Sequence, residues 1–297
     1  MRVGGFLVPR LLHAVARVAL EARMGYPAAM GERLLGRILV GVGGWTFEPW
    51  RDGVFYPKGW PQKRELEFAS RKLTAIEINA TYYGSQRLES FAKWREETPA
   101  DFVFAVKGPR FAVNRRVLAE AGESIERFFK TGVLELKEKL GPVNWQFATT
   151  KKFDPDDFSA FLTLLPKSIQ GQAIRHVVEV RHDSFRVAEF VELARKHEVA
   201  IVVAGDSAFP LIADVSAPFV YARVMGTSER QKLGLAPADL DLWAARARAW
   251  ADGRTPDGLP LLAKAAKAAK RDVFLFAISG FKDKNPAAAM ALIERLR

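Results

Sequence analysis

Eight short runs rich in β-branched and other apolar residues alternate with longer helix-like stretches along most of this 297-residue chain. The strand-like runs begin near Ile38, Ala75, Phe102, Val143, Val177, Ala200, Phe219 and Val273. The helix-like stretches span residues 61–72, 88–97, 124–138, 155–165, 187–197 and 237–250. Because eight strands alternating with helices over about 250 residues is the pattern of a (β/α)8 barrel, the sequence predicts an α/β fold of the TIM-barrel type.

Two connections depart from a regular barrel. The segment from Ala204 to Pro218 is too short and too broken by proline for a normal helix between strands 6 and 7, whereas Gly226 to Asp272 is long enough for two helices. Within the latter, the Ala/Lys-rich stretch from Leu261 to Lys270 is expected to be a helix with solvated lysines. We therefore predict a single TIM-barrel-like domain over residues 37–297, with an irregular connection between strands 6 and 7.

Residues 1–36 form an N-terminal extension that we expect to be helical or loosely ordered. Arg10 and Arg17 interrupt its apolar pieces before any reaches the roughly 18 residues of a membrane span, so no membrane association is predicted. The same pieces are too short for a secretory signal, and no small-residue cleavage site follows them.

The net charge of +11 is the feature of the composition that most indicates the kind of partner, since a basic surface attracts phosphates, nucleic acids and anionic small molecules. Residues 1–36 contribute five arginines and two glutamates, a net +3, and no run of five or more Lys/Arg occurs. The charge is therefore spread out, and solubility is its plainest interpretation.

The absence of cysteine excludes disulfides and thiolate chemistry and fits a cytoplasmic location. Oligomeric state is not predicted.

Five of the strand-like runs end in ionisable side chains. They are Ala75–Asn79, Phe102–Lys107, Val177–Arg181, Ala200–Asp206 and Phe219–Arg223. Alternation of period two places Glu77 and Asn79 on the strand face opposite Ile76 and Ile78. Since barrel active sites lie at the C-terminal ends of the strands, these residues predict a site there.

With these residues identified, the chain resembles the YecE-like family, a domain of unknown function with a TIM-barrel-like fold. The motifs that carry the resemblance are Gly41-Val-Gly-Gly-Trp45, Trp50, Phe55-Tyr-Pro57, Glu77-Ile-Asn-Ala-Thr-Tyr-Tyr83, Trp94, Thr98-Pro99, Lys107-Gly-Pro-Arg110, Lys139-Leu-Gly-Pro142, Gln146, Glu179-Val-Arg-His182, Asp206-Ser207 and Tyr221-Ala-Arg223. The resemblance implies the fold and the place of the site, but no activity. Met225 stands where the family usually has histidine, and the family's asparagine is missing from strand 8.

Glu77, Glu179 and Asp206 are candidate catalytic carboxylates. Glu77 is either a general base or metal ligand, or a buried partner for a cation. Glu179 and Asp206 form the best pair for acid/base work or for one Mg²⁺ or Mn²⁺ ion. With Lys107, Arg181 and Arg223, the three acids balance in charge, which is equally the pattern of a self-satisfied polar network.

Lys107 and Arg110 are candidate phosphate ligands. Lys107 is also able to form a Schiff base or a salt bridge to Glu77. Asn79 and Thr81 are expected to orient Glu77 or to bind substrate hydroxyls, and Gln146, Arg181 and Arg223 complete the polar substrate-binding candidates.

His182 is a candidate proton shuttle or metal ligand, or a surface residue. Because the chain has four histidines and no cysteine, no multi-zinc centre rich in imidazole is expected, whereas one divalent cation on carboxylates stays open. Trp45 and Tyr83 lie in the loops after strands 1 and 2, where they would stack on a base or sugar, or pack the loops onto the barrel rim.

Three functional hypotheses follow. The first is an isomerase, lyase or hydrolase that acts on a small anionic substrate, phosphorylated or sugar-like, at the C-terminal ends of the strands by carboxylate acid/base chemistry. The second is a protein that binds or processes nucleic acid. The third is a non-catalytic binding protein on a degenerate barrel.

Overall fold

Eight parallel strands close into a barrel in the computed structural model, which describes residues 36–297. The strand order is β1-β10-β9-β8-β7-β4-β3-β2, and Ile38 of the first strand pairs with Val273 of the last. The barrel strands are β1 Ile38–Gly43, β2 Ala75–Ile78, β3 Val103–Lys107, β4 Leu140–Gln146, β7 His176–Glu179, β8 Ala200–Gly205, β9 Phe219–Val224 and β10 Asp272–Ala277. The predicted (β/α)8 fold is confirmed.

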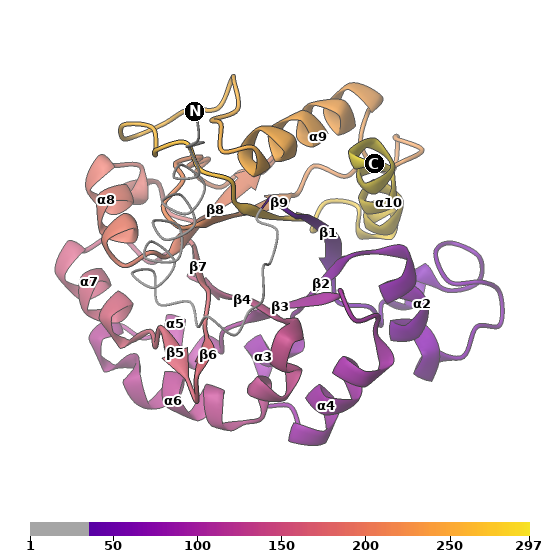
Figure 1. Cartoon of the computed structure of the whole chain (residues 1–297), viewed down its shortest axis with the longest axis horizontal. Coiled ribbons are helices and arrows are strands. Elements are labelled where there is room, and N and C mark those ends of the chain that lie inside the picture. The colour runs from indigo at the N-terminus through magenta and orange to yellow at the C-terminus, as the bar shows by residue number, and fades with distance from the viewer. Residues whose placement is uncertain (1–35) are drawn as a thin grey trace, which may run out of the picture. The chain divides into compact units, whose positions relative to one another are not determined.

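Helices surround these strands (Figure 1). The α-helices are α2 Glu65–Lys72, α3 Ala80–Tyr83, α4 Leu88–Glu97, α5 Arg110–Val113, α6 Gly122–Lys130, α7 Pro155–Leu164, α8 Ala188–Lys196, α9 Pro237–Ala251 and α10 Asn285–Leu296. Short 3-10 helices cover Glu48–Trp50, Gln62–Arg64, Leu118–Ala121, Val133–Lys139, Asp183–Phe185 and Lys282–Lys284. Asp154 caps α7, because its Oδ1 accepts a hydrogen bond from the Asp157 amide at 3.1 Å.

Apolar side chains fill one hydrophobic cluster that extends across the barrel strands. Its members are Leu39, Ala75, Val103, Ala105, Val177, Ala200, Val202, Ala217, Phe219, Tyr221, Phe274 and Phe276. Most residues of the eight strands are buried, as in parallel sheets covered by helices. Gly41 is needed for the approach of β1 to β2, since a Cβ there would lie 1.9 Å from the carbonyl oxygen of Ala75.

Strand β4 contains an irregularity that accommodates a proline. Phe104 pairs with Leu140 and Val106 pairs with Val143, so β4 uses one residue more than β3 over this interval. The extra residue falls at Gly141 and Pro142, and proline has no N–H to give to a neighbouring strand. The strand resumes its pairing before Asn144 and Gln146, which carry polar side chains at its C-terminal end.

Residues 168–173 contain a two-stranded hairpin that is separate from the barrel sheet. Strand β5, Ser168–Ile169, pairs antiparallel with β6, Gln172–Ala173. The turn residues Gln170 and Gly171 have φ values of 51° and 79°, the positive φ angles that tight hairpin turns require. The sequence analysis did not predict this hairpin.

Two predicted helices differ from the structure. Residues 261–270 contain no helix, and their chain bends at Leu262 and Ala263, whose amides donate to Asp214 at 2.9 and 3.0 Å. Arg195 also donates to the carbonyl of Lys264 at 2.8 Å. The helix predicted over 124–138 ends at Lys130, since Gly132 adopts a φ of 103° and a 3-10 helix follows.

Residues 204–218 contain no helix, as predicted from their prolines and length. The extension predicted over residues 1–36 lies outside the described residues except for Gly36. Between residues 36 and 297, no helix is both long enough and apolar enough to cross a membrane.

Replacing Asp214 by Ala tests what holds residues 261–270. The side chain of Asp214 is fully buried and serves two amides, so D214A should lower the free energy of unfolding by about 2–3 kcal/mol. Urea denaturation measures the loss, and faster tryptic cleavage at Lys264 or Lys267 reports local release. Asp241→Ala is the control, because Asp241 is 67% exposed in its pair with Arg295. Equal losses in both variants would contradict this role.

Candidate functional site

A buried guanidinium joins two buried carboxylates at the C-terminal ends of the strands. Arg223, in β9, donates from Nη1 to Glu179 Oε2 at 2.7 Å and from Nη2 to Glu77 Oε1 at 3.2 Å. None of the three side chains is more than 3% exposed. The structure therefore brings together three of the predicted residues from β2, β7 and β9, with opposite charges in direct contact.

Further donors occupy the remaining carboxylate oxygens. The Tyr221 hydroxyl donates to Glu77 Oε2 at 2.5 Å, and Asn144 Nδ2 lies 3.3 Å from Glu77 Oε2 and 3.2 Å from Glu179 Oε2. Arg181 donates from Nε and Nη2 to Glu179 Oε1 at 2.9 and 2.6 Å. Every oxygen of the two carboxylates thus has a hydrogen-bond donor. We call Glu77, Glu179, Arg181, Arg223, Tyr221, Asn144 and Lys107 the charged cluster.

The electrostatics of the charged cluster keep Glu179 ionised. Burial works to raise the pKa of Glu179, but the charges of Arg223, Arg181 and Lys107 outweigh it and hold that pKa below its usual value. Conversely, burial and the neighbouring Glu77 carboxylate raise the pKa of Tyr221, which stays a neutral donor. A carboxylate saturated with donors in this way is a weak proton acceptor. The geometry therefore favours the network interpretation of the two glutamates over general-base catalysis.

Lys107 ends β3 beside this network and differs from its other cations. Its ammonium group hydrogen-bonds to Gln146 Oε1 and lies 4.7 Å from the ring centroid of Tyr82. Within residues 36–297, Lys107 makes no ion pair, so the salt bridge to Glu77 is not formed. Burial is the main reason that the pKa of Lys107 falls to about 8, and the charges of Glu77 and Glu179 oppose this shift.

Asp206 does not join Glu179 in the structure. Strand β8 ends at Gly205, and Asp206 takes a φ of 53°, so the chain turns out of the strand at this residue. Its carboxylate is exposed and accepts a hydrogen bond from Trp243 Nε1 of α9 at 2.8 Å. The expected balance of three acids and three cations is therefore wrong. Two carboxylates meet three cations, and one positive charge is in excess when Lys107 is protonated.

Three other predicted residues have mainly structural contacts. The hydroxyl of Thr81 is buried and donates to the carbonyl of Lys107 at 2.7 Å, so it holds backbone instead of Glu77. Asn79 packs against β1, where a Cβ on Gly43 would lie 2.8 Å from its Nδ2. His182 Nδ1 accepts from the amide of Ser184 at 3.1 Å and caps the 3-10 helix that follows.

The aromatic and loop candidates divide into one packed and two exposed residues. Trp45 is half-buried and meets the rings of Trp94 and Phe104 edge-on, with centroids 5.1 and 6.3 Å away. This contact supports the packing interpretation for Trp45. Tyr83 is 66% exposed, and Arg110 is exposed with its guanidinium 5.2 Å from the ring centroid of Phe111.

An apolar wall adjoins the charged cluster. Ala204, Met225 and Ile278 form a buried cluster against which Phe209 packs. The guanidinium of Arg181 lies 4.3 Å from the Phe209 ring centroid and so links the wall to the charges. Met225 thus supplies packing at the position where the resemblance leads one to expect histidine.

The sequence analysis missed Tyr221, Asn144 and Tyr82. Two of these had a usable signal, because Tyr221 lies two residues before Arg223 and Asn144 lies two residues before Gln146, on the same strand faces. Tyr82 reaches Lys107 from a short helix that the alternation could not predict.

Within residues 36–297, no group of three or more His, Asp or Glu side chains is arranged to hold a metal ion. These residues therefore contain no such group of ligands for the divalent cation that was considered from the sequence.

Fold and site together define a TIM-barrel protein with a buried charged cluster at its C-terminal mouth. The family model described as protein of unknown function DUF72 matches residues 39–297, and the chain belongs to this family. The UPF0759 protein YecE of Escherichia coli (strain K12) is 28% identical over 149 residues, which is 50% of this chain and 50% of that protein. The match thus spans about half the length of this curated relative. The resemblance inferred from the motifs is confirmed.

Two crystal structures of DUF72 family proteins share the fold. The protein from Thermotoga maritima MSB8 has a TM-score of 0.64 and 21% identity, with 88% of this chain and 99% of that chain covered. The protein from Enterococcus faecalis V583 has a TM-score of 0.64 and 15% identity, with 87% and 95% covered. At these identities the likeness shows the barrel and not its chemistry.

Arg223→Met should strongly destabilise the barrel. The change leaves two buried carboxylates without their shared guanidinium, so we expect a loss of about 3–5 kcal/mol in urea denaturation at pH 7. In the variant the folded-state pKa of Glu179 rises because the charge of Arg223 is lost, and the loss should shrink as the pH falls and Glu179 becomes protonated. Arg181→Met is the control with a smaller expected loss, because the Arg181 side chain is 19% exposed. A loss in R223M that does not change with pH would contradict this account.

Lys107→Met should stabilise the protein at neutral pH. The folded-state pKa of Lys107, about 8, lies below its usual 10.5, so the unfolded chain binds more protons between these values and wild-type stability rises with pH there. The gain in K107M should be about 1–3 kcal/mol at pH 7 and shrink as the pH rises through 8 toward 10.

Lys139→Met is the matched control for this prediction. Lys139 is as buried as Lys107, but its ammonium donates to the Thr98 carbonyl at 2.7 Å and to the Thr98 hydroxyl at 3.1 Å. Burial lowers the pKa of Lys139 as well, but K139M removes these hydrogen bonds and should therefore destabilise the protein at pH 7. Chemical denaturation from pH 6.5 to 10 measures the stability of both variants. Destabilisation by K107M at pH 7 would refute the expectation that the buried Lys107 charge lowers the stability of the wild type.

Proposed function

We propose that this protein is an enzyme that binds a small anionic substrate, phosphorylated or sugar-like, at the C-terminal mouth of its barrel, with Lys107 as the proton-transfer group. The observation that carries the proposal is the buried Lys107 ammonium, which lacks a carboxylate partner among the described residues and has a pKa near 8. A group whose pKa lies close to the working pH is suited to both accept and return a proton.

The charges and free donors around Lys107 support an anionic substrate. The charged cluster has one excess positive charge when Lys107 is protonated, and burial strengthens the attraction that this charge exerts. Arg181 donates to Glu179 from Nε and Nη2, which leaves its Nη1 to bind a substrate oxygen. Gln146 accepts from Lys107 through Oε1, so its Nε2 is a further donor beside the ammonium.

The glutamates have a positioning role in this proposal. Glu179 fixes the guanidinium of Arg181 through two hydrogen bonds, and Arg223 ties Glu179 to Glu77. Lys107 then replaces the carboxylates as the group that moves a proton. As a neutral amine it is also the form that adds to a carbonyl carbon, so isomerase, lyase and hydrolase reactions are all within its chemistry.

A screen of ligand-induced thermal shifts tests the proposal. Sugar phosphates, nucleotides, simple carboxylates and divalent cations are offered to the full chain, because a ligand that binds only the folded form raises the melting temperature. We expect at least one small anion to raise it by several degrees at pH 7, with a weaker shift above pH 8 as Lys107 loses its proton. K107M and Arg181→Met should abolish the shift, whereas Arg186→Met, an exposed arginine, should retain it.

The screen also separates the other two hypotheses. Nucleic-acid binding, suggested by the net charge of +11, would appear as oligonucleotide affinity that falls steeply with salt. A degenerate barrel would bind anions equally in wild type and K107M. No shift with any anion, or a shift that survives in both K107M and R181M, would refute the proposed site.

A further inference from the structure

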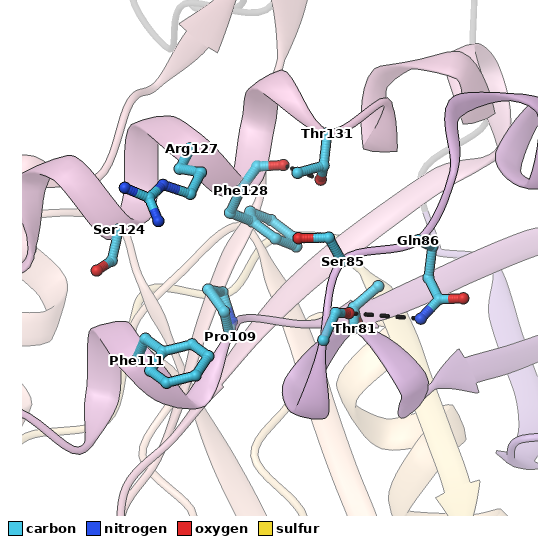
Figure 2. Close-up of a pocket in the computed structure, with 10 residues that line it drawn as sticks. Thr81, Ser85, Gln86, Pro109, Phe111, Ser124, Arg127, Phe128 and Thr131 are labelled. Atoms are coloured by element: carbon cyan, nitrogen blue, oxygen red, sulfur yellow. Dashed lines mark hydrogen bonds between the residues drawn. The ribbon is translucent and has the colours of Figure 1, made fainter.

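A pocket of about 80 Å³ lies between α3, α5 and α6, apart from the charged cluster (Figure 2). None of the charged-cluster side chains lines it. It meets the site only through backbone, because Thr81 lines the pocket while its hydroxyl donates to the carbonyl of Lys107 at 2.7 Å. Neither the sequence motifs nor the proposed function accounts for this pocket.

The apolar part of the pocket suits a flat ring. Phe111, Pro109 and Phe128 contribute to the lining, and Figure 2 shows Pro109 lying between the two phenylalanines. Phe128 is buried, and Phe111 is 62% exposed with the Arg110 guanidinium 5.2 Å from its ring centroid. A ring placed against Phe111 and Pro109 would remove this apolar surface from water and gain aromatic contacts.

The polar part of the pocket offers unused hydrogen-bonding groups. Among the described residues, the Ser85 hydroxyl has no hydrogen-bond partner. Gln86 uses its Nε2 on the carbonyl of Gly84 at 3.4 Å, so its Oε1 is open. Figure 2 shows both residues on the side of the pocket opposite Phe111.

Positive charge lies at the α6 end of the pocket. Arg127 gives one hydrogen bond, from Nη2 to Glu123 Oε1 at 2.6 Å, and its other N–H groups make no hydrogen bond to the described residues. Ser124 accepts from Arg115 Nη2 at 3.2 Å, which leaves the Ser124 proton to be donated to a ligand. A hydroxyl donor and a guanidinium lining the same end of a pocket favour a negatively charged oxygen.

We infer that this pocket is a binding site for a small aromatic carboxylate, with the ring against Phe111 and Pro109 and the carboxylate at Ser124 and Arg127. The inference is independent of the chemistry proposed for Lys107, since the two sites share no ligand-binding side chain. It assigns the exposed Phe111 and the open donors of α6 to one ligand.

Benzoate binding to the full-length protein tests the site. Saturable binding is expected by calorimetry or by ligand-observed NMR, with benzyl alcohol weaker because it lacks the charge. Phe111→Ser and Arg127→Gln should each weaken benzoate by about fivefold or more, through loss of the ring contact and of a charge-assisted hydrogen bond.

The control is Lys130→Gln on the same helix. Lys130 pairs with Glu126 four residues earlier and is 72% exposed, much as Arg127 pairs with Glu123 and is 73% exposed, but Lys130 does not line the pocket. K130Q should leave benzoate affinity unchanged. Absence of saturable binding to wild type, or equal weakening by K130Q and R127Q, would overturn the inference.

A second measurement locates the ligand without relying on affinity. The chain contains no cysteine, so S85C creates a single thiol at the pocket, and A238C creates one on the exposed start of α9. Benzoate should slow the reaction of S85C with a neutral disulfide several-fold and leave A238C unaffected. Equal rates with and without benzoate in S85C would exclude the pocket, whatever happens at Lys107.

Discussion

The pairing of Arg223 with Glu77 and Glu179 is the interaction on which the rest of the barrel mouth depends. A buried guanidinium and two buried carboxylates are each costly alone, and they are tolerated because each satisfies the others. The pairs join β9 to β2 and β7, strands that are not neighbours in the barrel order. Once they are in place, Asn144 and Tyr221 have fixed acceptors, and Lys107 is left with a neutral partner in Gln146.

Lys139 and Lys107 have similar exposed fractions but different hydrogen-bond partners. This difference distinguishes a structural lysine from a candidate for proton transfer. Lys139 and Lys107 are 5% and 7% exposed, yet the Lys139 ammonium donates hydrogen bonds to the carbonyl and the hydroxyl of Thr98. Lys107 has one amide oxygen and an aromatic face, in the field of two arginines. The first arrangement fastens the end of the 3-10 helix Val133–Lys139 to Thr98, which follows α4. The second arrangement lets the Lys107 ammonium release its proton near pH 8.

The succession of eight strand-like runs and helical stretches was enough to predict the barrel and to bring Glu179 and Arg223 to its C-terminal end. Period-two alternation placed Glu77 on the polar strand face, because a strand has only two faces. It failed at Asp206, where a positive φ just past the end of β8 turns the side chain toward Trp243. It also could not show that residues 261–270, which have helical composition, form no helix and donate two amide hydrogen bonds to Asp214. Both errors arise from contacts between segments distant in sequence, which overrule local preference.

The wall of Ala204, Met225, Ile278 and Phe209 beside the charged cluster makes the mouth two-sided. One half offers cations and amide groups, and the other offers only methyl, methylene and ring carbons. Hydroxyl groups facing that second half would lose water without gaining a partner. On the function proposed above, a substrate in this mouth would place its ionic end at Lys107 and Arg181 and an apolar flank along the wall.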